Sequence, residues 1–382
     1  MSTPCETPPQ RRWLRRLACC LALPLAACAI RVAPVEPGAP LGQAPLLHPA
    51  AIEEAHRFLA TQTAFDAFVA MAGEREITRW GEADLPINTH SVRKSLLGAL
   101  VGIAVERGLM RLDDTLATLG IDEPATPLTA VERSATVRQL LQSRSGVYLQ
   151  AAGETQAMRD GRPQRGQFAP GAHFYYNNWD FNVLGAIFEA RTGLGIGQAL
   201  HDWIAVPTGM RSFRPEHVIY RDAERSRYRQ FVIFMSASDL ARFGALFAQQ
   251  GRWQGRQVVP AEWVEAGLAP QARLSGPPPF DGYGLLWWLD GRSGTAWADG
   301  WRGQYLLVDR ARGLAVVSRN DTGRNALSIA WAVAFGKDGL RDHHQHLWRL
   351  MIEATSARVG EIAPAAPTRM RTDSGAPAPG TR

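Results

Sequence analysis

The chain has 382 residues, of which 46% are hydrophobic and 20% charged, a composition that fits a sizeable folded core and excludes a disordered or fibrous protein. The formal net charge is +6, but the first 27 residues carry four arginines and one glutamate, which leaves about +3 for the rest. That small excess does not predict nucleic-acid binding. All four cysteines lie within the first 28 residues, so the remainder can contain neither a disulfide nor a cysteine nucleophile.

The first 27 residues are typical of an export signal. Four arginines precede an apolar run from Leu17 to Ala27, which is too short for a bilayer span of about 20 residues. The run ends in Leu-Ala-Ala followed by Cys28, which resembles the lipobox of bacterial lipoproteins; a plain signal peptide with an incidental cysteine is the alternative. We therefore expect an exported, periplasmic protein, held on a membrane surface by lipid on Cys28. Ala29 resembles the sorting pattern of the outer membrane, and the paired arginines also permit a twin-arginine signal.

Composition divides the rest of the chain into three parts. Residues 28–49 are rich in proline and alanine and suit a tether, and residues 361–382, with a similar composition, are predicted to be a disordered tail. The folded domain is therefore expected at residues 50–360.

The hydrophobic periodicity predicts strands near both ends of this domain and helices between them. The first part contains a helix at Ala51 to Thr61, strands at Phe65 to Met71 and Glu76 to Trp80, and a buried helix from Ser91 to Met110. Short helices follow at 137–142, 181–191, 196–204, 238–249 and 260–269, with no strand alternation between 112 and 280. Strand-length runs return at 285–289, 295–298, 304–309 and 314–319, before a closing helix at about Asn325 to Val333 or Asp342 to Ala357.

This order predicts an α+β fold. An antiparallel sheet built from both termini (about residues 50–90 and 281–360) would be flanked by helices, with a helical lobe (about 91–280) inserted between its halves. A cleft between two such lobes is the expected place for a functional site.

The clearest chemical signal is the Ser-x-x-Lys spacing of Ser91 and Lys94 at the start of the buried helix. Three residues make nearly one helical turn, so the hydroxyl and the amine face the same way. The chain has forty arginines and only two lysines. A buried amine near a helix N-terminus can lose its proton and act as a base, whereas an arginine stays protonated. A serine N-cap followed by a surface lysine is the alternative explanation.

A Tyr-x-Asn pattern occurs in two overlapping registers, Tyr175 with Asn177 and Tyr176 with Asn178. A phenol near a neutral lysine can shuttle a proton, and an asparagine amide can orient both the lysine and a substrate carbonyl. An aromatic loop that ends in an asparagine cap would give the same letters. The pattern alone does not choose between the two registers.

These motifs, in this order, resemble the serine β-lactamase superfamily, and especially its class C-like branch with carboxylesterases, D-aminopeptidases and aminohexanoate-oligomer hydrolases. Further matching segments lie at 108–114, 136–146, 170–185, 236–244 and 300–305, so the resemblance covers roughly residues 50–335. The family's Phe-x-Tyr-x-Asn stretch assigns Tyr176 and Asn178 as the motif pair. The resemblance implies the β-lactamase/transpeptidase-like fold.

It also implies a two-step acyl-enzyme mechanism that needs no cofactor or metal ion. Ser91 would attack a carbonyl carbon, with Lys94 and Tyr176 as general base and acid. Asn178 would position the substrate. The backbone N–H groups of Ser91 and Trp301, next to Gly300, would hold the oxyanion.

One motif departs from the family pattern. Where β-lactamases and penicillin-binding proteins carry Lys-Thr-Gly, this chain has Ala298-Asp299-Gly300. The lysine that meets a substrate carboxylate is missing, which argues against β-lactams or cell-wall peptides as substrates. Arg302 is a candidate replacement for that charge, and a surface arginine on a strand edge is an equally simple interpretation.

We therefore predict a serine hydrolase that cleaves an ester or amide bond of a small molecule. Two alternatives stay open: a β-lactamase or D-peptide hydrolase, and a catalytically silent homologue that binds penicillin or muropeptides. His343, His344 and His346 lack the spacing and companion ligands of a metal site, and none is predicted. The sequence leaves the oligomeric state open.

Overall fold

The computed structural model describes residues 48–62, 65–275, 279–323 and 339–356. All of them belong to one unit, Val32–Arg382. The expected export signal, Cys28, nearly all of the tether and the tail lie outside the described residues. Within the described ranges, none of the helices combines the length and the apolar character that a membrane span requires.

Both ends of the domain contribute strands to one eight-stranded antiparallel sheet, as predicted. The strand order is β2-β1-β13-β12-β11-β10-β9-β8. The strands are β1 (Ala67–Ala72), β2 (Arg75–Gly81), β8 (Ala272–Arg273), β9 (Gly282–Tyr283), β10 (Trp288–Asp290), β11 (Thr295–Gly300), β12 (Gln304–Asp309) and β13 (Leu314–Arg319). β1 pairs with β13 from Ala67 opposite Arg319 to Ala72 opposite Leu314. The N-terminal hairpin therefore lies beside the last strand.

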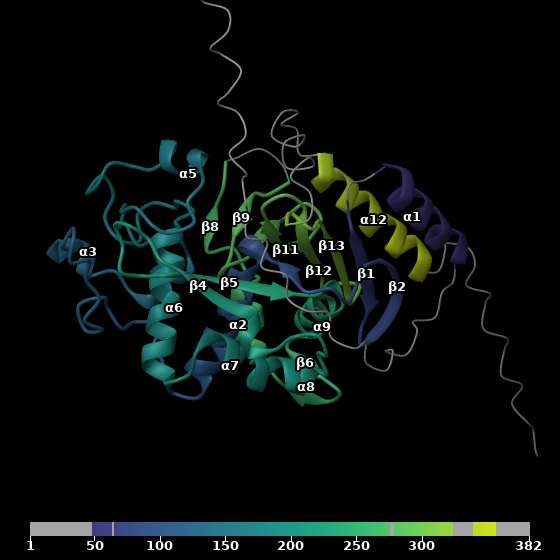
Figure 1. Ribbon diagram of the computed structural model, residues 1–382, viewed down its shortest axis with the longest axis horizontal. Helices are drawn as coiled ribbons and strands as arrows, with labels where there is room; N and C mark the ends of the chain where they lie inside the picture. The colour runs from purple at the N-terminus through teal and green to yellow at the C-terminus, as the bar shows by residue number, and fades with distance from the viewer. Residues whose placement is uncertain (1–47, 63–64, 276–278, 324–338, 357–382) are drawn as a thin grey trace, which may run out of the picture. The chain divides into compact units, whose positions relative to one another are not determined.

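Helices cover both faces of this sheet. α1 (Pro49–Gln62) and α12 (Gly339–Thr355) contact each other over the face that carries Phe68 and Trp297, and Figure 1 shows them side by side. α9 (Ala237–Ala248) packs on β1, β12 and β13, against the side chains that alternate with those of the first face. The closing helix is thus the later of the two predicted segments; the earlier one lies outside the described residues.

The buried helix predicted from Ser91 begins as a 3₁₀ turn, η1 (His90–Val92), and continues as α2 (Arg93–Glu106). α2 contacts α6, α7 and α10. At Gly102 a Cβ would come within 2.3 Å of the Trp263 ring, so this contact requires glycine. The other helices are α3 (Ala130–Arg133), α4 (Val137–Leu141), α5 (Gln156–Asp160), α6 (Asn178–Thr192), α7 (Ile196–Leu200), η2 (His201–Ala205), α8 (Val206–Thr208), η3 (Pro215–His217) and α10 (Ala261–Gly267).

The absence of strands between residues 112 and 280 was a wrong prediction. β4 (Val218–Arg221) and β5 (Gln230–Met235) form a second antiparallel sheet with β3 (Ile87–Asn88), in the order β3-β5-β4. β5 reads Gln-Phe-Val-Ile-Phe-Met and is buried on both faces, so it has no polar alternation that could distinguish it from a buried helix. β3 leads directly into η1, and this small sheet therefore anchors the start of α2.

Three further elements complicate the predicted division into two lobes. β6 (Arg252–Trp253) and β7 (Arg256–Gln257) form a hairpin. β8, which lies in the range expected for the helical lobe, is the edge strand of the large sheet, and α9 from the same range packs on that sheet. Residues before the predicted boundary at 280 therefore also contribute to the large sheet and to the helices that pack on it.

Candidate active site

A cavity of about 370 Å³ lies where the start of α2, the start of α6 and the end of β11 come together. Ser91, Lys94, Tyr176, Asn178 and Trp301 all line it. These residues come from three separate motifs of the sequence, and the structure brings them to one place.

Lys94 connects the two groups that the sequence pairs with it. Its Nζ lies 2.8 Å from Ser91 Oγ and 2.6 Å from the Tyr176 hydroxyl, and donates a hydrogen bond to each. Lys94 is only 2% exposed. Its amine also lies over the rings of Tyr176 and Phe181, at 4.4 and 4.7 Å from their centroids. The surface-lysine interpretation of the Ser-x-x-Lys pattern is therefore wrong.

The surroundings of Lys94 favour a neutral amine. Burial lowers the pKa of Lys94 well below its ordinary value, and the positive charge of Arg93 lowers it further, against an opposing effect of Asp299. Burial also raises the pKa of Tyr176, so its hydroxyl keeps its proton at neutral pH. A neutral amine between two hydroxyl groups can accept a proton from one and pass a proton to the other.

The structure places Tyr176 and Asn178 at the cavity and gives their neighbours structural roles. The hydroxyl of Tyr175 donates to the carbonyl of Met158, and Asn177 caps α6 by accepting from the N–H of Trp179. Asn178 Nδ2 donates to the Gly153 carbonyl at 2.7 Å. Its Oδ1 is enclosed and has no hydrogen-bond partner among the described residues. A polar atom of this kind in a cavity wall is available to a ligand.

A buried carboxylate that the sequence analysis did not single out holds this region together. Asp180 Oδ1 accepts from Ser145 Oγ at 2.6 Å and from Asn177 Nδ2 at 3.0 Å. Burial raises the pKa of Asp180 well above its ordinary value, in opposition to these hydrogen bonds. Asp180 thus ties the Ser145-Gly146 segment to the first turn of α6. The segment had a family resemblance, but nothing in the sequence indicated its partner.

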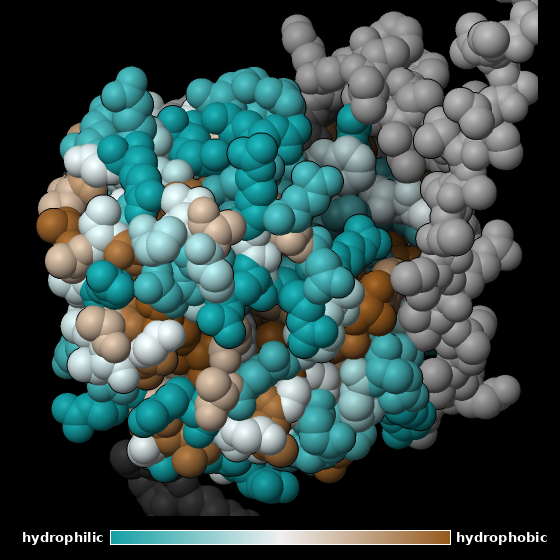
Figure 2. Space-filling model, turned by 60° about the vertical axis from the view of Figure 1, so that its left-hand side comes forward, coloured by the Kyte–Doolittle hydropathy of each residue, from teal (hydrophilic) through white to brown (hydrophobic). Residues whose placement is uncertain are grey.

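The end of β11 approaches the nucleophile turn closely. At Gly300 a Cβ would come within 2.7 Å of the Thr89 carbonyl oxygen, so only glycine fits there. The next residue, Trp301, is 43% exposed and its ring packs edge-on against that of His90. Few large hydrophobic side chains are exposed in the described part of the chain. On the face shown in Figure 2, hydrophobic residues are mixed with hydrophilic ones. An exposed tryptophan beside a cavity is therefore a candidate contact for a ligand.

Arg302 does not take the place expected for it. The cavity lining does not include Arg302, whose backbone is left-handed (φ 62°) and whose guanidinium lies 4.9 Å from the Trp301 ring centroid. The cation that lines the cavity beside β11 is Arg341, which donates from Nε and Nη2 to Asp299 Oδ2 at 3.0 and 2.7 Å. Arg341 is on α12, far from every motif, so no sequence signal identified it.

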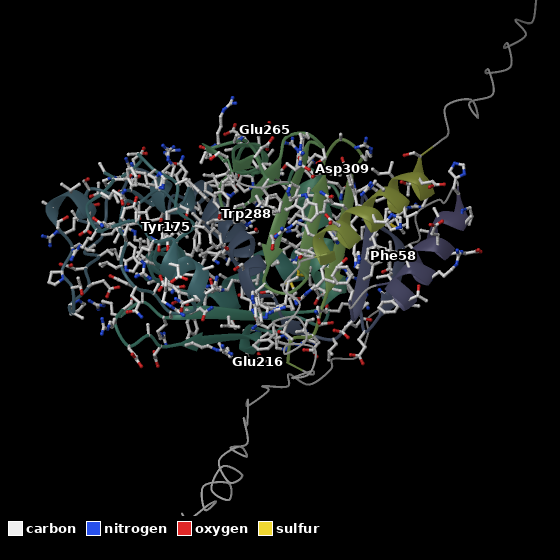
Figure 3. All side chains as sticks on the ribbon, turned by 90° about the horizontal axis from the view of Figure 1, so that it is seen from above. Phe58, Tyr175, Glu216, Glu265, Trp288 and Asp309 are labelled. Atoms are coloured by element: carbon white, nitrogen blue, oxygen red, sulfur yellow. The ribbon has the colours of Figure 1, made fainter. Side chains whose placement is uncertain are left out.

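Aromatic rings form the wall next to Tyr176. Trp288 lies 5.1 Å from Tyr176 and 5.3 Å from Phe280 between ring centroids, and both Trp288 and Phe280 line the cavity. Figure 3 labels Tyr175 and Trp288, and in this view Tyr175 lies in the part of the molecule that contains α3 to α7. Trp287, in contrast, is buried against Phe247 and belongs to the core.

Comparison with known proteins matches the family and the fold of this chain. The family model described as Beta-lactamase matches residues 62–337, and the chain belongs to this family of serine hydrolases. No group of three or more His, Cys, Asp or Glu side chains in the described ranges could hold a metal ion.

The chain is 27% identical over 291 residues to the 6-aminohexanoate-dimer hydrolase of Paenarthrobacter ureafaciens, a match that covers 65% of this chain and 70% of that protein. Among solved structures it resembles a penicillin-binding protein homologue from Caulobacter crescentus, with a TM-score of 0.55 and 17% identity over 73% of this chain and 93% of that one. A β-lactamase from Mycobacterium bovis aligns with a TM-score of 0.50 and 20% identity, over 76% and 99% of the two chains. These structures show the fold.

Proposed function

We propose that the protein cleaves an ester or amide bond of a small molecule through an acyl-enzyme on Ser91. The observation that carries the proposal is the contact of the enclosed Lys94 amine with both the Ser91 and the Tyr176 hydroxyl groups. When the amine is neutral, the serine O–H donates to it, which is the arrangement of a nucleophile and its base. The amide-cleaving relative supports an amide as the substrate bond.

In the first step, Ser91 Oγ forms a bond to the carbonyl carbon and its proton passes to Lys94. Backbone N–H groups at Ser91 and Trp301 stabilise the negative charge that develops on the carbonyl oxygen. The bond from carbon to the leaving oxygen or nitrogen then breaks, and the leaving atom takes a proton through Tyr176. Lys94 returns to the neutral state by supplying that proton.

In the second step, water replaces the leaving group. Lys94 and Tyr176 take a proton from the water as its oxygen attacks the ester carbon, and the proton then returns to Ser91 Oγ as the acid is released. Asn178 binds the substrate in both steps. Its Oδ1 has no partner among the described residues and can accept a hydrogen bond from a substrate N–H.

The alternatives receive less support from the site. A β-lactamase or D-peptide hydrolase would be expected to carry a lysine where β11 has Ala298. Retention of all four polar site residues argues against a catalytically silent penicillin- or muropeptide-binding homologue. Turnover of a chromogenic cephalosporin would favour the former, and slow acylation without release the latter.

Export and attachment to a membrane surface through Cys28, with sorting to the outer membrane, form part of the proposal. Their support is the arginine-rich segment, the apolar run and the cysteine that follows it. In a Gram-negative host, Cys28→Ala should move the protein from the membrane to the soluble periplasmic fraction. An unchanged distribution would contradict the anchor.

The nucleophile is tested by intact-mass measurement of the full chain after incubation with a fluorophosphonate. One adduct is expected in the parent and none in Ser91→Ala. Ser95→Ala is the matched control, since Ser95 is buried four residues away and donates to the Leu286 carbonyl. An adduct that persists in Ser91→Ala, or no adduct in the folded parent, would contradict the proposal.

A further inference from the structure

Arg93, the first residue of α2, is a buried cation in the wall of the cavity. It is 2% exposed, and its Nε and Nη1 are enclosed without a hydrogen-bond partner among the described residues. None of the ion pairs found between described residues includes it. The guanidinium lies over the Phe231 ring, 4.7 Å from its centroid, a contact that supplies no hydrogen-bond acceptor. A buried charge that the residues around it do not compensate destabilises the fold, and a bound anion would remove this cost.

Among the described residues that line the cavity, Arg93 is the cation without a compensating charge. Arg341 pairs with Asp299, which is the acidic residue in the lining. Burial lowers the pKa of His90 to about 3, so this ring is neutral, and Lys94 is neutral for the reason given above. Burial lowers the pKa of Arg93 only to about 10, which keeps its charge at neutral pH. The cavity therefore favours an anion.

The wall around Arg93 offers further polar groups. Gln230 of β5 lines the cavity, and at Gly153 a Cβ would come within 2.4 Å of Gln230 Nε2, so the glycine leaves room for that amide. The side chain of Asn178 donates a hydrogen bond to the carbonyl of the same Gly153. A planar guanidinium with a neighbouring amide suits a carboxylate, which can accept two parallel hydrogen bonds from arginine.

The position of Tyr176 indicates which part of the substrate reaches Arg93. Because Tyr176 delivers the proton to the leaving atom, we place the leaving group beside Tyr176 and the aromatic rings of Trp288 and Phe280. We assign the acyl part to the polar lining that includes Arg93 and Gln230. Ser91 and Arg93 both line the cavity, so an acyl chain on Ser91 can extend to Arg93 within it.

We propose that the enzyme selects substrates whose acyl group ends in a carboxylate, and that Arg93 binds this carboxylate. The inference rests on the proposed function, since it names the substrate class of the same site. Esters and amides of short dicarboxylic acids are then preferred over those of uncharged acids. Acyl groups that end in an ammonium group are disfavoured, because Arg93 repels them.

The test compares two substrates with the same six-carbon acyl chain, mono-4-nitrophenyl adipate and 4-nitrophenyl hexanoate. For the parent, kcat/KM for the adipate should exceed that for the hexanoate by about tenfold or more. Arg93→Gln should bring this ratio to about one or below. The ratio separates binding of the carboxylate from any effect of Arg93 on Lys94, because such an effect changes both rates together. The Asp299→Asn/Arg341→Gln double variant is the matched control, because it removes another cation of the lining together with its paired carboxylate, and it should keep the ratio.

Isothermal titration calorimetry with 6-oxoheptanoate and 2-heptanone, two ketones that differ in the terminal carboxylate, tests the same site without turnover. 6-Oxoheptanoate should bind the parent more tightly than 2-heptanone does, and Arg93→Gln should lose the difference. Equal or better hydrolysis of the hexanoate by the parent, or a ratio that falls in the Asp299→Asn/Arg341→Gln double variant and not in Arg93→Gln, would overturn the inference. Failure of the proposed function gives a different result, namely no hydrolysis of either ester and no fluorophosphonate adduct on Ser91. If Arg93→Gln does not fold, the inference is decided by whether the parent prefers the adipate ester to the hexanoate ester.

Discussion

Two arginines, Arg93 in the cavity wall and Arg319 between the two sheets, are equally inaccessible to solvent and differently surrounded. Burial lowers the pKa of both, to about 10 for Arg93 and about 9 for Arg319. Arg319 donates from Nε to Gln304 Oε1 at 2.7 Å and from Nη1 to the Met235 carbonyl at 2.9 Å. Its Nη2 donates to the carbonyls of Ile87 and Asn88. Arg93 has no comparable acceptor among the described residues.

The difference teaches that burial alone does not identify a functional charge. Arg319 joins β13 of the large sheet to β3 and β5 of the small one, next to the turn that carries Ser91, and every acceptor around it comes from the chain. Arg93 lines a cavity, and its Nε and Nη1 have no hydrogen-bond partner in the described ranges. Counting the hydrogen bonds of a buried group separates a structural residue from one that is available to a ligand.

The strongest test of this comparison is the stability of two matched variants. Arg319→Met should lower the free energy of unfolding by about 3 kcal/mol or more, because it leaves several buried carbonyl and amide acceptors without a donor. Arg93→Met should leave the stability unchanged or raise it, because it removes a buried charge that no described residue compensates. Denaturant-induced unfolding of both variants and the parent measures the two effects. A large loss of stability in Arg93→Met would mean that Arg93 is a structural residue after all.

A second test applies the same reasoning to the adjacent tyrosines. Tyr176→Phe should lower kcat/KM by about 100-fold, because the proton of the leaving group loses its donor. Tyr175→Phe removes a hydroxyl that is bonded to the Met158 carbonyl, and we expect an effect of about 1 kcal/mol on stability with little change in turnover. Steady-state kinetics with ethyl hexanoate, whose alkoxide leaving group needs this proton, distinguishes the two. Similar losses of activity in both variants would contradict the assignment of the register.

The smallest expected effect is a displacement of the pH profile. The base must be neutral, so kcat/KM rises as the pH increases through the pKa of Lys94. Arg93 lowers that pKa, so Arg93→Gln should move the acidic limb of the profile to higher pH. Asp299 raises it, so Asp299→Asn should move the limb to lower pH. An uncharged substrate such as the hexanoate ester keeps carboxylate binding out of the measurement. Displacements in the same direction would show that these two charges do not act on Lys94 as described.

The sequence was most informative where a function depends on local spacing. Ser91 and Lys94 lie one helical turn apart, which is why their spacing predicted a contact. The strands of both halves of the large sheet were predicted from strand-length apolar runs. The prediction failed for β5, because its unbroken apolar run has no period that distinguishes a strand from a helix. It also failed for Arg302, whose backbone is left-handed and whose guanidinium lies against the Trp301 ring. Arg341 and Asp180 could not be found, because their partners Asp299 and Ser145 are distant in the chain and only the fold brings them together. The sequence pattern alone did not choose between the two registers of the Tyr-x-Asn motif. The family resemblance favoured Tyr176 with Asn178, and the structure supports this choice because Tyr175 and Asn177 make structural hydrogen bonds.

The pairing of β1 with β13 has a consequence for synthesis of the chain. The backbone N–H of Asp321 donates to Asp66, which is 255 residues earlier, and the last wall of the cavity comes from Arg341 on α12. A ribosome that adds about 5–20 residues per second needs on the order of ten seconds or more for that stretch. During this time the β1–β2 hairpin lacks β13, the second neighbour of β1, and the Ser91 segment lacks the part of the cavity wall that Arg341 supplies. The hydrolase becomes competent only when almost the whole domain has emerged, and contacts of such high sequence separation make this final closure slow.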